Sequence, residues 1–320
     1  MLFACEAVSK LLYFLISKLK VANKTAVPFP SLPVEIFHLK GCNYIMDKIE
    51  YLYHYTSLES LALILKNKTI RLNPLDKMDD IQEQKTADIE NIGKFVFVSS
   101  WTDDDVESIP MWKMYTNPRC GVRIKLRKNP FLKHGTKCSD IKKVLGATLE
   151  DEKSRTTVMD TFLDLTAMLA GGYVSPQGWS GDILTKIEYT NDLDKLEPSV
   201  GSCENGKIRI ALGQLGKYKN THWKFQSEWR YIMVFVSMNF SQNPQKMVSD
   251  FSQTIQQMLN GLAEPPFRYY DLDIDPKYFE EMEITCSPQM SAGNRAILET
   301  LVERYNPKAT ILESELLGKI

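Results

Sequence analysis

From about Met46 onwards, hydrophobic and polar positions recur with regular spacings, and the pattern predicts interleaved strands and helices. Apolar side chains at every second position are typical of a strand, and spacings of three and four are typical of a helix. The stretches predicted as strands are 49–56, 70–73, 94–102, 120–126, 183–190, 223–235, 281–288 and 309–314. Helices are predicted at 57–70, 108–116, 159–170, 247–262 and 295–305, and a helix or turn at 207–220. The fold class is therefore α/β or α+β.

The first predicted helix has a capping signal at its start. Thr56 followed by Glu59 fits the capping box, so we expect the helix to begin just after His54. Such a start would bring free backbone N–H groups and the positive end of the helix dipole close to the His54 imidazole.

The stretch 223–235, WKFQSEWRYIMVF, begins with polar side chains at every second position. In a strand, Lys224, Gln226, Glu228 and Arg230 would share one face, opposite the tryptophans. The simplest interpretation is a solvated face whose Glu and Arg form ion pairs. By similar local reasoning, His54 is expected to cap or pack, and the aromatic side chains of 108–116 to lie in the core.

Composition and charge narrow the classes of function. The 320 residues are 43% hydrophobic and 10% aromatic, which is enough for a sizeable core. The net charge is -1, so no global field attracts nucleic acid or an anionic membrane. One local basic patch, 125–137, is either a phosphate or nucleic-acid contact or an exposed loop, and we favour the loop.

The cysteines and histidines are scattered along the chain. The six cysteines include no CxxC pair, and the four histidines form no cluster with metal-ligand spacing, so we expect no metal site. This cysteine usage favours a reducing, cytoplasmic compartment.

The first 45 residues form a separate region in our interpretation. The apolar run 11–17 is shorter than the roughly 20 residues that cross a bilayer. The alternatives are a membrane or partner helix and a signal peptide, and we favour a loosely attached extension. We therefore predict an N-terminal extension, 1–45, and a single domain, 46–320, without stable membrane association.

Several short motifs together resemble known proteins. They are YLYHYTSLESLALIL from residue 51, SSWTDDDVESIPMWKMY from 99, CGVRIKL from 120 and WKFQSEWRYI from 223. This series is similar to a bacterial family of domains of unknown function with Tyr-His-Tyr-Thr, Ser-Trp-Thr, Met-Trp-x-x-Tyr and Glu-x-Glu-x-Arg motifs. The order of His, aromatic residue and Gln-x-Glu also resembles the ADP-ribosyltransferase superfamily. That resemblance implies an α+β fold with a split β-sheet core flanked by helices.

Carried over by position, the resemblance implies a site for NAD as substrate. Glu228 would be the catalytic acid, and Gln226, where the motif has its first acid, would face the acceptor. The residues implied to bind the cofactor are His54, Tyr55, Thr56, Ser100, Trp112, Tyr115 and Arg230. For Arg230, pairing with Glu228 and contact with phosphate remain alternatives.

The function implied is a cytoplasmic, NAD-dependent ADP-ribosyltransferase, a bacterial toxin or phage-defence effector. Its acceptor would be a protein or nucleic acid, and a regulatory partner protein is conceivable. The alternatives are a non-catalytic nucleotide-binding or interaction module on the same fold and an NAD glycohydrolase. Fold alone does not decide among them.

Overall fold

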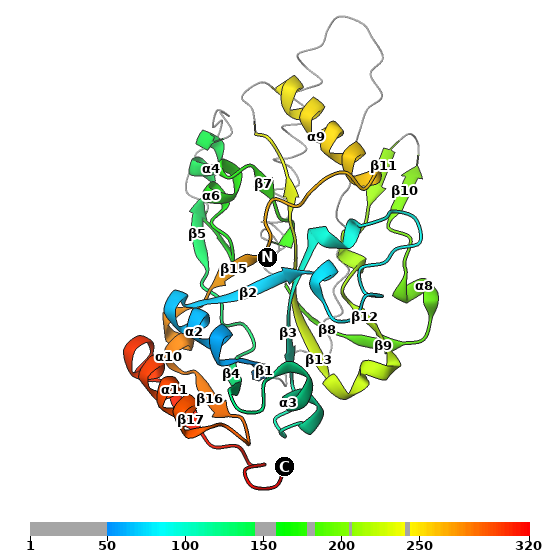
Figure 1. The fold of residues 1–320 in the computed structure, drawn as a ribbon. Coiled ribbons are helices and arrows are strands. Elements are labelled where there is room, and N and C mark those ends of the chain that lie inside the picture. Colours follow the sequence, from blue (N-terminus) through cyan, green and yellow to red (C-terminus); the bar gives the residue numbers. More distant parts are fainter. Residues whose placement is uncertain (1–49, 145–157, 178–182, 205–206, 241–243) are drawn as a thin grey trace, which may run out of the picture.

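A computed structural model describes residues 50–144, 158–177, 183–204, 207–240 and 244–320, and the structural statements below refer to these residues. The main sheet contains Tyr51–Ser57 (β1), Thr69–Pro74 (β2), Val96–Thr102 (β3), Gly121–Arg127 (β4), Leu184–Lys186 (β8), Glu228–Val234 (β13), Tyr270–Asp273 (β15), Glu283–Cys286 (β16) and Thr310–Leu312 (β17). Its order is β15-β2-β3-β1-β4-β16-β17, and β13 connects β3 to β8 (Figure 1). The fold is thus mixed α/β with one large mixed sheet.

Strand β3 is the branching point of this sheet. β13 pairs antiparallel with β3 at every residue from Val96 to Thr102, which occupies one edge of β3. The other edge is shared, because β2 pairs with Phe97 and Val98 while β1 pairs only with Thr102. The sheet therefore divides along this edge, opposite the middle of β3.

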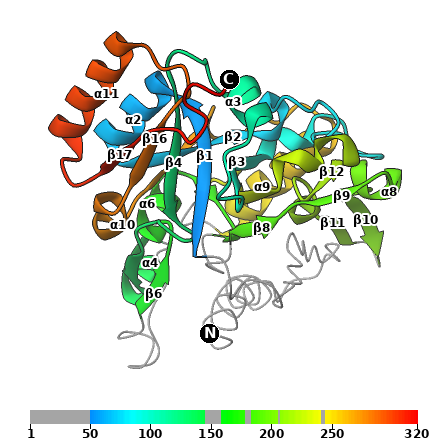
Figure 2. The same cartoon turned by 90° about the horizontal axis from the view of Figure 1, so that it is seen from below.

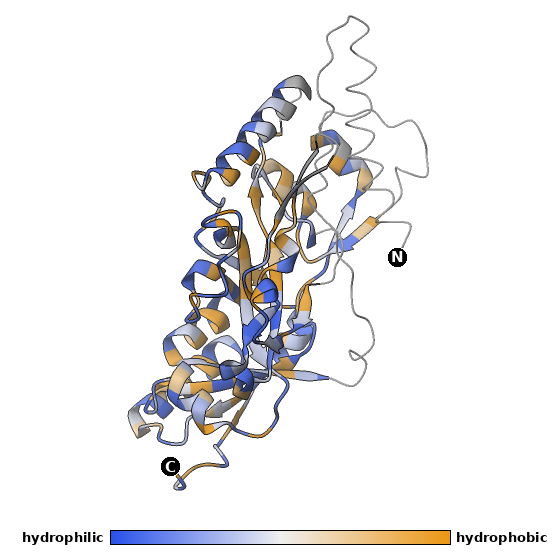
Figure 3. Ribbon diagram, turned by 90° about the vertical axis from the view of Figure 1, so that its right-hand side faces the viewer, coloured by the Kyte–Doolittle hydropathy of each residue, from blue (hydrophilic) through white to orange (hydrophobic). Residues whose placement is uncertain are grey.

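Helices flank the sheet. The α-helices are Leu58–Asn67 (α2), Ile109–Tyr115 (α3), Cys138–Val144 (α4), Leu165–Ala170 (α6), Leu193–Leu196 (α8), Pro244–Leu259 (α9), Pro276–Glu280 (α10) and Ala292–Tyr305 (α11). Short 3-10 helices span Leu75–Lys77 (η1), Ile92–Phe95 (η2), Leu212–Gln214 (η3) and Thr221–Gln226 (η4). Figure 2 shows α2 and α11 side by side against β1, β4 and β16, and their apolar residues join the core of those strands. In Figure 3 the hydrophobic residues are concentrated in the central strands.

Four two-stranded sheets complete the described structure. The strands are His134–Lys137 (β5) with Val158–Thr161 (β6), Tyr173–Val174 (β7) with Val236–Ser237 (β14), Glu188–Thr190 (β9) with Tyr218–Asn220 (β12), and Gly201–Glu204 (β10) with Lys207–Ile210 (β11). The β9–β12 pair is parallel, and β12 immediately precedes η4 and β13 along the chain. This connection places β12 beside the candidate site.

The predicted cap of the first helix, Thr56, is wrong by one residue. Thr56 lies in β1, because β1 stays paired with β4 as far as Ser57 and Gly121. The helix cap is Ser57, whose hydroxyl accepts a hydrogen bond from the Ser60 N–H at 3.1 Å, and α2 begins at Leu58.

The prediction of one strand over 223–235 is also wrong in its first half. The chain forms η4 up to Gln226, and Ser227 adopts a left-handed conformation with φ 44° and ψ 48°. The strand proper begins at Glu228. The left-handed residue breaks the alternation, so Lys224 is exposed instead of sharing a face with Glu228.

Three further stretches differ from prediction, and in two of them tertiary pairing replaces a local helix. The start of 159–170 belongs to β6, which pairs with β5, and α6 begins only after Asp164 caps the Thr166 and Ala167 N–H groups. The stretch 207–220 contains β11, η3 and β12. The stretch 183–190 is two strands, interrupted at Ile187.

The remaining predicted elements are confirmed within one to three residues. The C-terminal strand, helix and strand form a βαβ unit in which β16 and β17 pair in parallel. The predicted extension, 1–45, lies outside the described residues, and the division into domains stays a prediction. No helix in the described part of the chain has the length and apolar character needed to cross a membrane.

Candidate functional site

Strand β13 carries Glu228 and Arg230 into the interior of the protein. Glu228 is 3% exposed and Arg230 is 1% exposed, so the predicted solvated face is wrong. The reason is that β13 lies between β3 and β8, and apolar clusters cover its two faces, one around Tyr231 and one around Ile232. The ion pair is confirmed, because Arg230 Nε donates to Glu228 Oε1 at 2.6 Å.

Two residues from other segments close these charges into a ring. Lys219, on β12, donates from Nζ to Glu228 Oε2 at 2.9 Å and lies 3.0 Å from Glu83 Oε1. Glu83 also binds Arg230 through its second oxygen. The charge ring, Glu83, Lys219, Glu228 and Arg230, therefore alternates in sign and has no net charge. Because buried charges require compensation, this neutrality is what allows the four residues to lie inside.

The charge ring is covered on one side by Gln226 and Tyr115. Lys219 Nζ donates to Gln226 Oε1 at 2.8 Å, and Gln226 Nε2 donates to the Tyr115 hydroxyl oxygen. Gln226 is buried, and Tyr115 is half-buried at the end of α3. On the β9 side, the Tyr189 hydroxyl accepts a hydrogen bond from the Glu228 main-chain N–H at 2.8 Å.

Burial and neighbouring charges shift the pKa values of Glu228, Tyr115 and Tyr189. Burial alone would raise the pKa of Glu228, but the charges of Arg230 and Lys219 outweigh burial and lower that pKa to about 2. Burial, with the nearby carboxylates, raises the pKa of Tyr115 and of Tyr189 above their ordinary values. At neutral pH, Glu228 is therefore a carboxylate and both tyrosines are protonated.

Trp112 and Tyr55 contact each other and are not part of the charge ring. Their rings meet edge to face at 4.9 Å between centroids. Trp112 Nε1 donates to the buried Glu107 carboxylate at 2.8 Å, and the Tyr55 hydroxyl accepts from the Ser108 N–H at 3.0 Å. These contacts fix α3 against β1, and they make Trp112 and Tyr55 supports of the helix that carries Tyr115.

His54 and Thr56 lie on the opposite face of the sheet from Glu228. Glu228 and Thr102 are paired, and Thr102 pairs with Tyr53, so the alternation of strand side chains turns His54 the other way. His54 packs at 5.0 Å from the Trp101 ring, and its Nδ1 donates to the Ser100 carbonyl at 2.8 Å. This hydrogen bond to Ser100 lies along the edge of β3 where the sheet divides. Burial of the imidazole lowers the pKa of His54.

The structure thus brings together only part of the predicted set. Tyr115, Gln226, Glu228 and Arg230 meet, and Ser100 stands opposite Arg230 on β3. Glu83 and Lys219 were missed by sequence reasoning. A signal was present, since the apolar residues that follow Arg230 indicate a buried strand, and buried charges need partners. The sequence around Glu228 and Arg230 does not indicate which residues these partners are.

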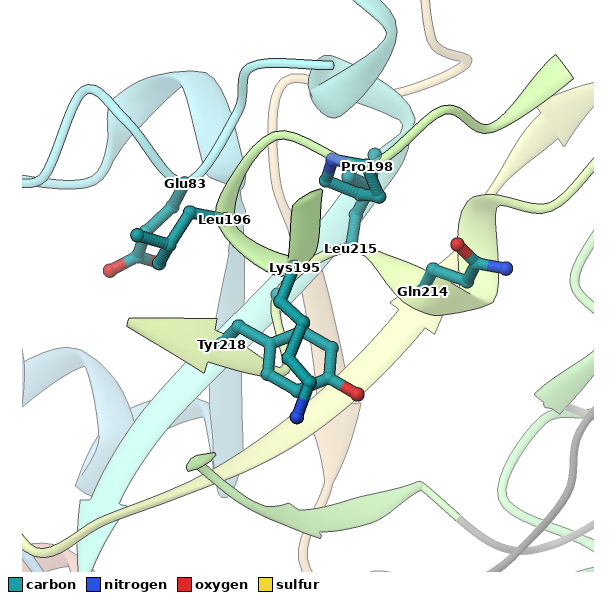
Figure 4. Close-up of a pocket in the computed structure, with 8 residues that line it drawn as sticks. Glu83, Lys195, Leu196, Pro198, Gln214, Leu215 and Tyr218 are labelled. Atoms are coloured by element: carbon teal, nitrogen blue, oxygen red, sulfur yellow. The ribbon is translucent and has the colours of Figure 1, made fainter. Parts of the chain in front are cut away.

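A small pocket lies beside the charge ring, at Glu83 (Figure 4). Its lining residues are Glu83, Lys195, Leu196, Pro198, Gln214, Leu215, Gly216 and Tyr218. Its volume of about 10 Å³ has room for about one water molecule, so it does not accommodate a nucleotide. Across the described ranges, no three His, Cys, Asp or Glu side chains are grouped so as to hold a metal ion.

Comparison of the chain with protein-family models, with curated proteins and with solved structures gives no match.

Proposed function

We propose that the protein is an NAD-dependent ADP-ribosyltransferase with Glu228 as its catalytic carboxylate. The observation that carries the proposal is the meeting of Tyr115, Gln226 and Glu228 at one place, although α3 and β13 are more than 100 residues apart in the chain. The motif resemblance assigns these residues to one site. The division of the sheet at β3 also suits the split-sheet core of that superfamily.

In the proposed reaction, the bond between the ribose C1′ and the nicotinamide nitrogen breaks, and its electron pair leaves with nicotinamide. The acceptor then supplies the pair for the new bond to C1′ and releases its proton to water. The ionised Glu228 stabilises the positive charge that develops on the sugar and binds a ribose hydroxyl. Each carboxylate oxygen can accept more than one hydrogen bond, so a ribose hydroxyl can bind Glu228 while the Lys219 and Arg230 contacts remain.

Tyr115 has a defined part in this proposal. Its hydroxyl oxygen accepts from Gln226, and its raised pKa keeps the phenol protonated, so its O–H can donate to the nicotinamide amide. The acceptor is a protein or nucleic acid, with Gln226 as the hydrogen-bonding group nearest to it. We place the activity in a bacterial cytoplasm, as a toxin or phage-defence effector.

A specific observation favours a second candidate, a non-catalytic nucleotide-binding module on the same fold. Glu228 is 3% exposed and both of its oxygens are occupied, which suits a fixed binding element as well as a catalyst. The two candidates differ in whether the glycosidic bond of NAD is broken.

The test is incubation of the purified protein with NAD labelled in its adenylate part and a cell extract. The Glu228→Asp variant keeps the charge ring neutral while it withdraws the carboxylate by about one methylene. The exposed Glu303→Asp on α11 is the matched control for shortening a glutamate by one methylene. We expect wild type and the control to release nicotinamide and to label a macromolecule, and Glu228→Asp to lose at least about 90% of both activities.

Each other outcome of this experiment has a definite meaning. Release of free labelled ADP-ribose with no labelled macromolecule would identify an NAD glycohydrolase instead. If folded wild type releases no nicotinamide with any extract yet binds NAD, the non-catalytic module is correct and the transferase proposal is wrong.

A further inference from the structure

Lys219 is the central donor of the site, although it lies outside every motif of the sequence. Its ammonium group contacts three oxygens, Gln226 Oε1 at 2.8 Å, Glu228 Oε2 at 2.9 Å and Glu83 Oε1 at 3.0 Å. The first two contacts are hydrogen bonds, and the third is an ion pair with the Glu83 carboxylate. Its side chain is 7% exposed, which makes the contacts internal to the protein.

The contact with Lys219 fixes the orientation of the Gln226 amide. Because an ammonium group only donates, the Gln226 atom that faces it must be the oxygen. The amide NH₂ of Gln226 is then turned to the Tyr115 hydroxyl and donates to its oxygen. Lys219 thereby leaves the Tyr115 hydroxyl hydrogen available for a ligand.

Lys219 also balances the charges around Glu228. Without Lys219, the two carboxylates Glu83 and Glu228 would share the single cation Arg230. A buried group of net charge -1 favours uptake of a proton. Glu83 has the complementary effect, because without it two cations would face one carboxylate.

We propose that Lys219 and Glu83 are positioning residues of the candidate site. Lys219 holds the Glu228 carboxylate ionised and orients Gln226 and Tyr115, and Glu83 balances the charge of Lys219 and Arg230. The catalytic part of this inference rests on the proposed ADP-ribosyltransferase function. The electrostatic part is independent of it.

The titration of Glu228 depends on every charged or titratable group around it. These groups come from four segments besides its own strand, and they are Arg230 on β13, Lys219 on β12, Glu83 between η1 and η2, Tyr115 on α3 and Tyr189 on β9. Both tyrosines stay protonated at neutral pH, so the decisive charges are those of the charge ring.

The first experiment measures the titration of the Glu228 carboxyl by NMR in protein labelled with ¹³C at the glutamate side-chain carboxyl. The signal is assigned by its loss in a charge-balanced variant, Glu228→Gln with Lys219→Met. We expect no titration of Glu228 between pH 4 and 8 in the wild type, consistent with its pKa of about 2. In Lys219→Met, we expect the Glu228 pKa to rise by about two pH units or more, into this range.

Two further variants make the interpretation unambiguous. Glu83→Gln combined with Lys219→Met leaves one carboxylate beside one cation, so the Glu228 pKa should return below pH 4. Lys308→Met removes an exposed lysine that pairs with Glu280 and should leave the titration unchanged. If Lys219→Met does not fold, Lys219→Gln replaces it, with the same expected rise. No change of the Glu228 titration in the folded variant would overturn the inference.

The second experiment follows nicotinamide release and macromolecular labelling in the same variants. In Lys219→Met, we expect kcat to fall by about tenfold or more at pH 6 and to recover partly as pH rises and Glu228 ionises. The double variant with Glu83→Gln should regain the low pKa but not the label transfer, because Gln226 is no longer oriented. A changed KM with unchanged kcat would contradict the positioning of the reacting groups.

The two experiments separate the inference from the proposed function. If the NMR titration moves as expected and the folded wild type releases no nicotinamide, the electrostatic role of Lys219 stands and the transferase is excluded. If the wild type is active and Glu228 does not respond to Lys219→Met, the transferase stands and the positioning role is excluded.

Discussion

Two sets of ion pairs occupy the same face of the sheet, and they differ in burial. One is the charge ring around Glu228. The other, on β4, is a surface ladder that includes Lys125 with Glu283 at 2.7 Å and Arg127 with Glu281 at 3.0 Å. Glu283 and Glu228 lie in one row of paired residues that crosses the sheet. The successive partners in this row are Glu283, Lys125, Tyr53, Thr102 and Glu228.

Distance does not distinguish the two sets, but exposure does. The Lys125 and Glu283 side chains are 24% and 34% exposed, whereas those of Lys219 and Glu228 are 7% and 4% exposed. Exposed ion pairs contribute about 0 to 1 kcal/mol, because water solvates the separated charges nearly as well. In a buried pair, loss of one partner leaves a charge that water cannot reach. On this face, removal of one charged side chain should therefore cost more stability in the charge ring than in the surface ladder.

The ladder also revises the interpretation of the basic patch at 125–137. Its first residues belong to β4 instead of an exposed loop, and Lys125 and Arg127 each have carboxylate partners. With these two cations paired, the β4 part of the patch gives little support for a phosphate or nucleic-acid contact.

The largest expected difference between the two sets is in stability. Glu228→Gln should lower the free energy of unfolding by about 3 to 5 kcal/mol, because it leaves Lys219 and Arg230 with a single buried carboxylate. Glu283→Gln, the same substitution in the ladder, should lower it by less than about 1 kcal/mol. Urea denaturation of the two variants measures both values. Equal losses in the two variants would contradict the distinction between the regions.

Acid should affect the charge ring next most strongly. The pKa of Glu228 is lowered to about 2 in the folded protein, below its value of about 4.5 when unperturbed. The unfolded state therefore binds the proton more tightly, so this stabilisation is present above about pH 4.5 and is lost as pH falls towards 2. Denaturation midpoints from pH 6 to 3 should fall less steeply in the charge-balanced variant Glu228→Gln with Lys219→Met. Parallel curves for this variant and wild type would contradict the assignment.

A buried histidine extends the comparison to a single titratable group. Burial lowers the pKa of His54, so between the folded value and about 6.5 the unfolded state binds the extra proton. Stability from this group is complete above about pH 6.5 and decreases as pH falls below it. His54→Gln should therefore flatten the stability profile between pH 7 and 5, as measured by urea denaturation. An unchanged slope would show that His54 does not titrate with folding.

The smallest expected effect is that of salt on the ladder. Raising the salt concentration from 0.05 to about 1 M shortens the screening length to about 3 Å and weakens exposed pairs. The stability difference between wild type and Lys125→Met, below about 1 kcal/mol in low salt, should then approach zero. For Lys219→Met most of the difference should persist, since ions do not enter the charge ring. Thermal denaturation at the two salt concentrations makes this comparison.

The sequence predicts this fold best where the signal is local. β1, β3 and β4 are recognised from apolar and β-branched runs, and the C-terminal βαβ unit from its strand, helix and strand order. Prediction fails where a single residue or a strand distant in sequence determines the local secondary structure. The left-handed Ser227 ends the expected alternation, and pairing with β5 makes a strand of 158–161.

The candidate site shows the same limit more sharply. The strand pattern is enough to select Glu228 and Arg230, because the two residues share one face of β13. Glu83 contacts Arg230 from 147 positions away, and no periodicity of the chain indicates this contact. Likewise, the alternation of β1 separates His54 from Glu228, although both flank β3. Only the three-dimensional arrangement identifies the charge ring.

The most direct test measures nicotinamide release from NAD by wild type, Glu228→Asp and Glu283→Asp, each shown to be folded. The two substitutions are chemically identical and affect carboxylates of the same row of the sheet. We expect Glu283→Asp to match the wild type and Glu228→Asp to be slower by about tenfold to a hundredfold. Equal rates in the two variants, or no release by the folded wild type, would contradict a catalytic role for Glu228.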